Sequence, residues 1–233
     1  YYGGVNGPQV HLGAGLWDRG NVVIGVYGMW DGHPSNDRNL TCMHLGMVVT
    51  HDMLHYTESM PNFPLVTAGE QKNNTPAHNH FPALMQGQGM ENIGDQTMFW
   101  YGLWPECDSN GVRLATWPRD RIGYLQPFAK PGQDAFLISD RIHLEGKTGR
   151  VMLNISGLGE YSKMRVSVLD EAFQPVPGYG ADECELIGEN GLRVPVAWGN
   201  KLVIHSDKPV RLRIDFCGIR PEDISLYAVY VEA

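Results

Sequence analysis

The sequence predicts an all-β protein, a partial β-propeller followed by a β-sandwich, on three observations. The 233 residues include 28 Gly and 15 Pro, and no window of about 12 residues keeps a helical apolar period without one of them breaking it. Short runs rich in β-branched and aromatic residues recur along the chain between turn residues. The character of these runs changes near residue 125, which indicates two domains.

Turn residues such as Gly20, Pro118 and Gly199 flank several of the predicted strands. In VRLRIDF (210–216) apolar residues alternate with charged ones, which predicts a strand with one wet face. The predicted strands are 21–30, 44–50, 97–104, 111–117, 150–156, 164–170, 192–198, 210–216 and 225–231.

The domain boundary is expected near residue 128, with blades in 1–127 and a sandwich in 128–233. The hinge is PFAKPGQDA (127–135). Residues 9–58 and 84–124 are loosely similar, and each fits one four-stranded blade of a propeller. Because two blades cannot close a ring, we expect the chain to continue from, or associate with, an amino-terminal propeller segment.

Charge and composition exclude several classes of partner. The formal net charge is −8, and this offers no basic surface for nucleic acid or anionic lipid. No apolar stretch is long enough to span a membrane. The amino terminus has neither an initiator Met nor a signal-peptide pattern, so we expect the carboxy-terminal part of a longer protein. The four Cys show no CxxC spacing.

Two stretches resemble a known family. VVTHDMLHYTESMPNFPLV (48–66) resembles the S-x-D-G-x-x-W outer hairpin of five-bladed propeller glycoside hydrolases, with His51, Asp52, Met53 and His55 in the turn. The carboxy-terminal sandwich of the family 32 group carries V-x-L-L-D-x-x-G-x-P-I-x-G-Y/F. Two segments of this chain are similar to that sandwich: MRVSVLDEAFQPVPGYGADECELIG (164–188) and VPVAWGNKLVIHSDKPVRLRIDF (194–216). The resemblance implies the last two blades and the sandwich of a family 32, 43 or 68-like glycosidase.

The carboxylates that the resemblance implies are not found at matching motifs. The family uses paired carboxylates for glycoside hydrolysis. Its Trp-Met-Asn-Asp-Pro motif is absent, and Arg119-Asp120 is followed by Arg121 instead of Pro. Glu106 in WPECD is similar to the family's Glu-Cys acid, but it comes too close to the sandwich and is read as a loop residue. We therefore expect the key catalytic carboxylates to lie mostly outside this chain.

The leading site candidate is QGQGMENIGDQ (86–96). A sugar needs carboxylates and amides for its hydroxyls and an aromatic platform for its apolar face. Glu91 is the catalytic candidate, and Gln88, Asn92 and Asp95 are substrate-binding candidates. The alternative is that Glu91 and Asp95 accept hydrogen bonds from backbone amides in a tight Gly turn.

The equivalent inner strand of the preceding blade supplies three more substrate-binding candidates. His11 begins a Gly-rich strand, and Trp17 and Asp18 come at its end. Trp17 is alternatively a core residue, and Asp18 alternatively part of a hairpin turn. The polar residues of loop 31–39 and the pair His78 and His80 are interpreted as ordinary loop residues, so no metal site or cofactor is expected. Loop 31–39 would nevertheless allow a structural calcium.

We predict a carbohydrate-active protein, a glycoside hydrolase of glycans or oligosaccharides, in which this chain supplies part of the substrate pocket. The alternative is a non-catalytic glycan-binding or assembly protein of the same fold. A third alternative is an unrelated double sandwich. A secreted or periplasmic location is favoured, and an oligomer is compatible with the sequence.

Overall fold

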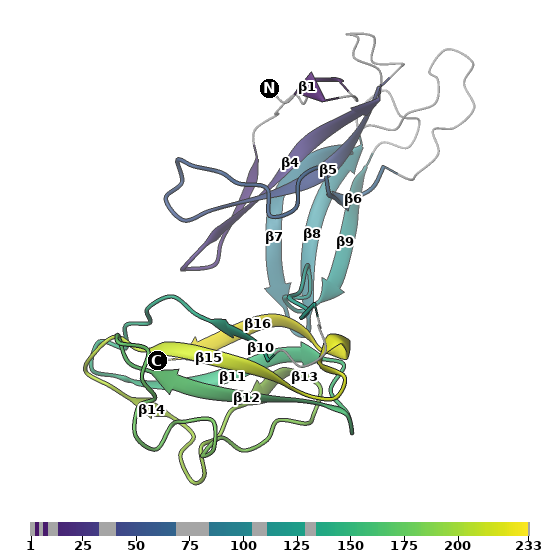
Figure 1. The fold of residues 1–233 in the computed structure, drawn as a ribbon. Coiled ribbons are helices and arrows are strands. Elements are labelled where there is room, and N and C mark those ends of the chain that lie inside the picture. Colours follow the sequence, from purple (N-terminus) through teal and green to yellow (C-terminus); the bar gives the residue numbers. More distant parts are fainter. Residues whose placement is uncertain are drawn as a thin grey trace. The chain divides into compact units, whose positions relative to one another are not determined.

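The fold is all-β, as predicted. The computed structural model describes residues 3–4, 7–8, 14–32, 41–68, 84–103, 111–128 and 134–232, and these form antiparallel sheets with no α-helix. One short 3₁₀ helix, η2 (Pro221–Asp223), is present (Figure 1). None of these residues belongs to a helix that could cross a membrane.

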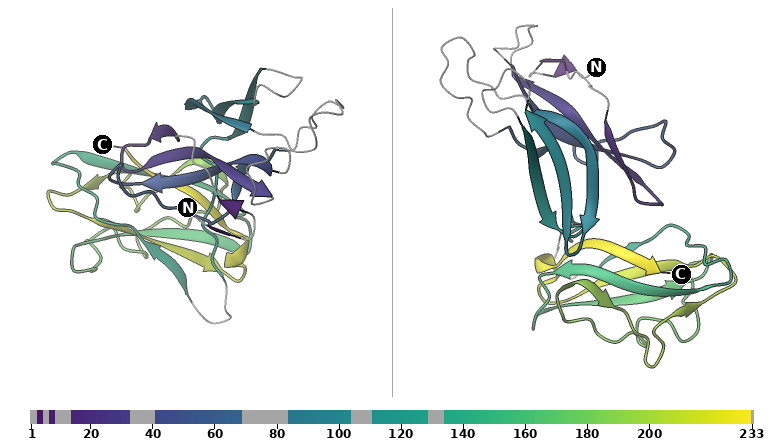
Figure 2. Two further views of the ribbon diagram at one scale, coloured as in Figure 1. Left: turned by 90° about the horizontal axis from the view of Figure 1, so that it is seen from above. Right: turned by 180° about the vertical axis from the view of Figure 1, so that it is seen from behind.

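The chain divides into two compact units, Tyr1–Arg119 and Asp120–Ala233. Each unit contains its own sheets, which Figure 2 shows from two further sides.

The described residues of unit 1 form two larger sheets and one small one. The first sheet has the order β3-β4-β5-β6, and the second has the order β7-β8-β9. A two-stranded sheet, β1-β2, lies near the amino terminus. The strands are β1 (Gly3–Gly4), β2 (Gly7–Pro8), β3 (Gly15–Asp18), β4 (Val23–Gly32), β5 (Thr41–Thr50), β6 (Pro64–Val66), β7 (Leu84–Ile93), β8 (Gln96–Leu103) and β9 (Val112–Pro118).

The two larger sheets of unit 1 pack against each other through β7, which contacts β3, β4 and β5. A Cβ atom at Gly28 of β4 would lie 3.5 Å from Oε1 of Gln86 in β7, so these two residues lie on the facing surfaces. Val26 is two residues from Gly28 in β4 and so lies on the same surface. Phe99 lies on the surface of Gln86, because it is two residues from Tyr101, which pairs with Gln86, and both Val26 and Phe99 are buried. Apolar burial between the sheets therefore stabilises unit 1.

In unit 2, residues 120–128 and 134–232 form two sheets. One has the order β10-β15-β12, and in the other β11 pairs with β13, β14 and β16. The strands are β10 (Ala135–Ile138), β11 (Thr148–Ser156), β12 (Ser162–Leu169), β13 (Gly191–Pro195), β14 (Ile204–His205), β15 (Arg211–Gly218) and β16 (Ser225–Glu232).

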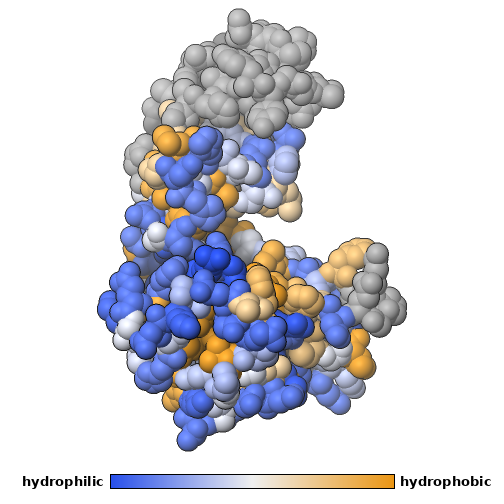
Figure 3. Space-filling model, turned by 60° about the vertical axis from the view of Figure 1, so that its left-hand side comes forward, coloured by the Kyte–Doolittle hydropathy of each residue, from blue (hydrophilic) through white to orange (hydrophobic). Residues whose placement is uncertain are grey.

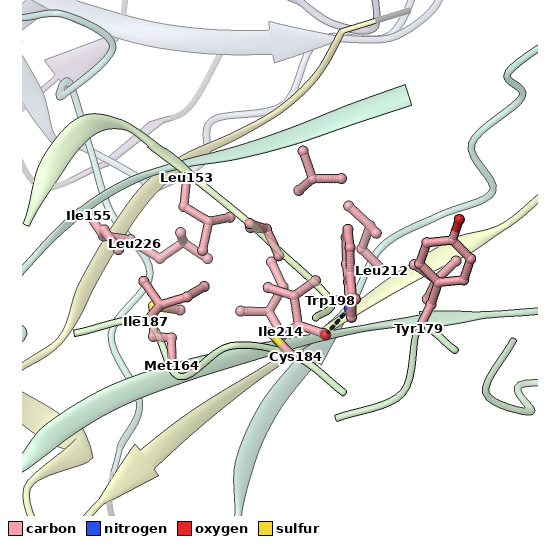
Figure 4. Close-up of a cluster of buried hydrophobic side chains, with 14 of the residues drawn as sticks. Leu153, Ile155, Met164, Tyr179, Cys184, Ile187, Trp198, Leu212, Ile214 and Leu226 are labelled. Atoms are coloured by element: carbon pink, nitrogen blue, oxygen red, sulfur yellow. Dashed lines mark hydrogen bonds between the residues drawn. The ribbon is translucent and has the colours of Figure 1, made fainter. Parts of the chain in front are cut away.

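The core of unit 2 lies between these sheets (Figure 4). Alternate residues of β15 are buried, so the predicted single wet face of 210–216 is confirmed. Trp198 is buried in this core, and its indole Nε1 donates a 2.8 Å hydrogen bond to the carbonyl of Val166. Its ring meets Tyr179 edge-on at 5.4 Å between centroids. A buried donor that is satisfied in this way fixes the orientation of the ring.

The segment after Arg119 packs on unit 2. Leu125 and Leu226 exchange two backbone hydrogen bonds, of 2.8 and 2.9 Å. Arg121 donates from Nε to Oδ1 of the fully buried Asn154 at 2.9 Å. The sequence places the boundary at 127/128, and these contacts join residues 120–126 to unit 2. Asn154 begins an Asn-Ile-Ser glycosylation triplet, and because it is fully buried it cannot receive a glycan in the folded state.

Candidate functional site

Strand β7 contains a glycine-lined bulge. Its register with β8 shifts between Gln86 and Met90, so the residues between them lie opposite Trp100 alone. A Cβ atom at Gly87 would collide with the backbone carbonyl oxygen of Trp100, and one at Gly89 would lie 3.3 Å from Cε3 of the indole. The glycines therefore allow a close approach of two strands. Bulges of this kind are common beside functional sites because they re-aim neighbouring side chains.

Glu91 follows the bulge and lies on the outer face of the β7-β8-β9 sheet. It pairs with Met98 of β8. Trp100 lies on the same face, because side chains two residues apart in a strand point the same way. Met90 and Phe99 are buried on the opposite face. The outer face thus presents an exposed carboxylate and a half-buried indole on one sheet.

Part of the polar cluster holds the β7-β8 hairpin together. Glu91 Oε1 accepts a hydrogen bond from the backbone N–H of Asn92 at 2.7 Å. The hydroxyl of Thr97 donates to Asn92 Oδ1 at 2.6 Å. Asp95 is exposed in the turn, and its carbonyl accepts the backbone N–H of Arg119 at 2.8 Å. The hairpin is consequently well fixed, and it leaves Glu91 Oε2 and the Asp95 side chain toward solvent.

The same outer face also carries exposed apolar side chains. Ile93, Val112 and Leu114 are 51%, 71% and 48% exposed. Strand alternation and register place all three in phase with Trp100. Figure 3 shows apolar side chains among hydrophilic ones on the described surface. A sheet face of this composition is typical of a surface that contacts another molecule or segment.

The preceding hairpin places Trp17 and Asp18 differently from the β7 residues. Trp17 is buried, with the guanidinium of Arg19 4.3 Å from its ring centroid. Asp18 is exposed, and its Oδ1 accepts the backbone N–H of Gly20 at 2.7 Å. These are the contacts of a core tryptophan and of a turn aspartate. Their proposed roles toward a ligand stay predictions.

The loop between β5 and β6 is built around Asp52. Its carboxylate accepts the backbone N–H groups of Leu54 and His55 and lies 2.6 Å from Nδ1 of His55. The hydrogen bond from the His55 side chain is the main reason that the pKa of Asp52 lies below its usual value, with the backbone donors adding to it. The hydroxyl of Tyr27 donates to Glu58 farther along the loop. No local pattern pointed to this contact, because the two residues are far apart in sequence.

Trp100 was not among the candidates predicted from the sequence. The structure places it on the outer face, on the same side of its strand as the exposed Gln96. This polar neighbour two residues away was the available signal. No group of three or more potential metal ligands occurs among the residues that the structure describes. Several candidates lie outside them: His11, residues 33–40, His78, His80, Glu106 and the side chains of Asp31 and Gln88.

Comparisons with known proteins identify no family. No family model and no curated protein matches the chain. A solved structure of the family 32 β-fructofuranosidase BmSUC1 from Bombyx mori is similar over 94% of this chain and 79% of that chain, at 8% identity and a TM-score of 0.22. Likeness at that level carries no argument about fold or activity.

Proposed function

We propose that this protein is carbohydrate-active and hydrolyses glycosidic bonds in a glycan or oligosaccharide. The observation that carries the proposal is the outer face of the β7-β8-β9 sheet, where Glu91 and Trp100 lie in phase on a rigid strand pair. A carboxylate beside an indole offers hydrogen-bond acceptors for hydroxyl groups and a flat surface for the apolar side of a sugar ring.

In this proposal Glu91 is the catalytic carboxylate that this chain supplies. Gln88 and Asp95 bind substrate beside it. Asn92 lies on the opposite face, in register with the buried Thr97, and Trp17 is buried, so the roles of these two residues stay predictions, as do those of Asp18 and His11. The two larger sheets of unit 1 are blades of a five-bladed propeller, and unit 2 is its accessory β-sandwich. The remaining blades and carboxylates come from a further segment or another chain.

A specific observation favours a second candidate function. Ile93, Val112 and Leu114 make the Glu91 face more apolar than a sugar site requires. A protein that binds glycan without cleaving it, or builds an assembly, would use the same face with no catalytic partner for Glu91.

The test compares the parent protein with Glu91→Gln on a panel of neutral oligosaccharides. Assayed together with the segment or chain that supplies the remaining carboxylates, the parent should release reducing sugar, and the variant should lose about 100-fold or more of that rate, as for removal of an acid or base catalyst. Glu160→Gln, an exposed glutamate of unit 2, is the control and should keep full activity. Binding without release by the parent would support the non-catalytic alternative, and neither binding nor release would reject both.

A further inference from the structure

The outer face of the β10-β15-β12 sheet in unit 2 carries two exposed aromatic rings, each backed by an arginine. The guanidinium carbon of Arg213 lies 4.1 Å from the ring centroid of Phe136. That of Arg211 lies 4.9 Å from the ring centroid of Phe173. Phe136 and Phe173 are 49% and 52% exposed, so about half of each residue is accessible. Arg211 and Arg213 alternate along β15 and point away from the core.

Phe173 occupies a backbone position that suits glycine. Its φ is +61°, which bulky side chains rarely adopt. The turn is fixed by Asp170, whose Oδ1 accepts the backbone N–H groups of Ala172 and Gln174 at 2.9 and 2.8 Å. The backbone N–H of Phe173 itself donates to the Asp170 carbonyl at 3.1 Å. A large ring held in a strained conformation and left half-exposed indicates a role outside folding.

Arg211 and Arg213 are each paired with a carboxylate on this face. Arg213 donates from Nε to Asp215 at 2.9 Å. Arg211 donates to the carbonyl of Ser139 at 2.9 Å and lies 3.3 Å from Asp140 Oδ1. A polyanion would therefore meet a carboxylate beside each of these arginines. A paired guanidinium and carboxylate instead offer donors and acceptors suited to the hydroxyl groups of an uncharged ligand.

We propose that Phe136 and Phe173 form a stacking platform for an uncharged glycan, a second carbohydrate-binding surface apart from Glu91. This inference rests on the proposed function. The Cα atoms of the two supporting arginines are about 7 Å apart on one strand, and each guanidinium contacts one ring, so the two rings lie within the length of one oligosaccharide. The platform holds the glycan by its apolar ring faces, while the Arg213–Asp215 pair binds hydroxyl groups.

The test is native gel electrophoresis of the full chain in gels containing inulin, dextran or arabinoxylan as neutral polysaccharides and polygalacturonate as the anionic one. We expect at least one neutral polysaccharide to retard the parent. Phe173→Gly and Phe136→Ala should each weaken this retardation about tenfold in apparent Kd. Phe173→Gly also removes the strained backbone, so loss of binding with an undiminished melting midpoint separates recognition from misfolding.

Tyr161→Ala is the matched control, because Tyr161 is 50% exposed and precedes β12 at the end opposite Phe173. It should be retarded like the parent. Three results would overturn the platform and leave the proposed function standing. They are equal retardation of all variants, retardation by polygalacturonate alone, and no retardation of a parent that still releases sugar. A parent that neither binds nor releases sugar overturns both.

Discussion

Removing the Asn154 amide should destabilise unit 2 strongly. Asn154 is fully buried and accepts a 2.9 Å hydrogen bond from Arg121 Nε, while its Nδ2 donates to the hydroxyl of Tyr230 at 3.3 Å. In Asn154→Ala the guanidinium loses a buried acceptor. A buried hydrogen bond to a charged group contributes about 1.5–3 kcal/mol, so with the vacated volume we expect about 3 kcal/mol.

Differential scanning calorimetry of the full chain checks this prediction. A loss of about 3 kcal/mol lowers the melting midpoint of a unit of this size by about 10 °C. Arg121→Ala should cost a similar amount, and the double variant should cost less than the sum because both changes break one network. Asn200→Ala, at an exposed turn residue, is the control. If Asn154→Ala melts within about 2 °C of the parent, the reasoning about this buried network is wrong.

Three further predictions follow from the same structure. Gly87→Ala should destabilise unit 1 by about 3 kcal/mol in denaturant titration, because its Cβ meets backbone, whereas Gly123→Ala meets nothing within 4 Å and should be neutral. The NMR shift of the His55 backbone amide should titrate with a midpoint below 3.8, the usual pKa of an aspartate. The reason is that the lowered pKa of Asp52 keeps its carboxylate ionised, and bonded to this amide, until the pH falls through the pKa of the folded state. A midpoint at or above 3.8 would contradict this. Trp198→Phe should lower the free energy of unfolding of unit 2 by about 3 kcal/mol, and a change under about 1 kcal/mol would show that the indole hydrogen bond contributes little.

Local patterns in the sequence predicted the features that depend on neighbouring residues. The period-2 alternation of 210–216 predicted a strand with one wet face, and the structure has it. The Asp18-Arg19-Gly20 order indicated a hairpin turn, and Asp18 accepts the Gly20 amide there. Both outcomes are set by backbone geometry within a few residues.

Features that depend on distant partners were not predicted. The bulge in β7 exists because Gly87 lies against the backbone of Trp100, whereas the sequence predicted an inner strand or a tight Gly turn there. The pairing of Arg121 with Asn154 joins residues 33 positions apart. The left-handed backbone of Phe173 could not be read from its residue type, which disfavours that conformation. The propeller arrangement of unit 1 stays a prediction for the same reason, since it depends on how sheets pack.

The central claim is that the outer face of the β7-β8-β9 sheet contacts carbohydrate. The most direct test is an NMR titration of the ¹⁵N-labelled chain with a neutral oligosaccharide that it binds or cleaves. We predict that the indole N–H of Trp100 and the backbone amides of Glu91 and Asn92 shift together in a saturable manner. Saturable binding that leaves these three signals unmoved would contradict the account.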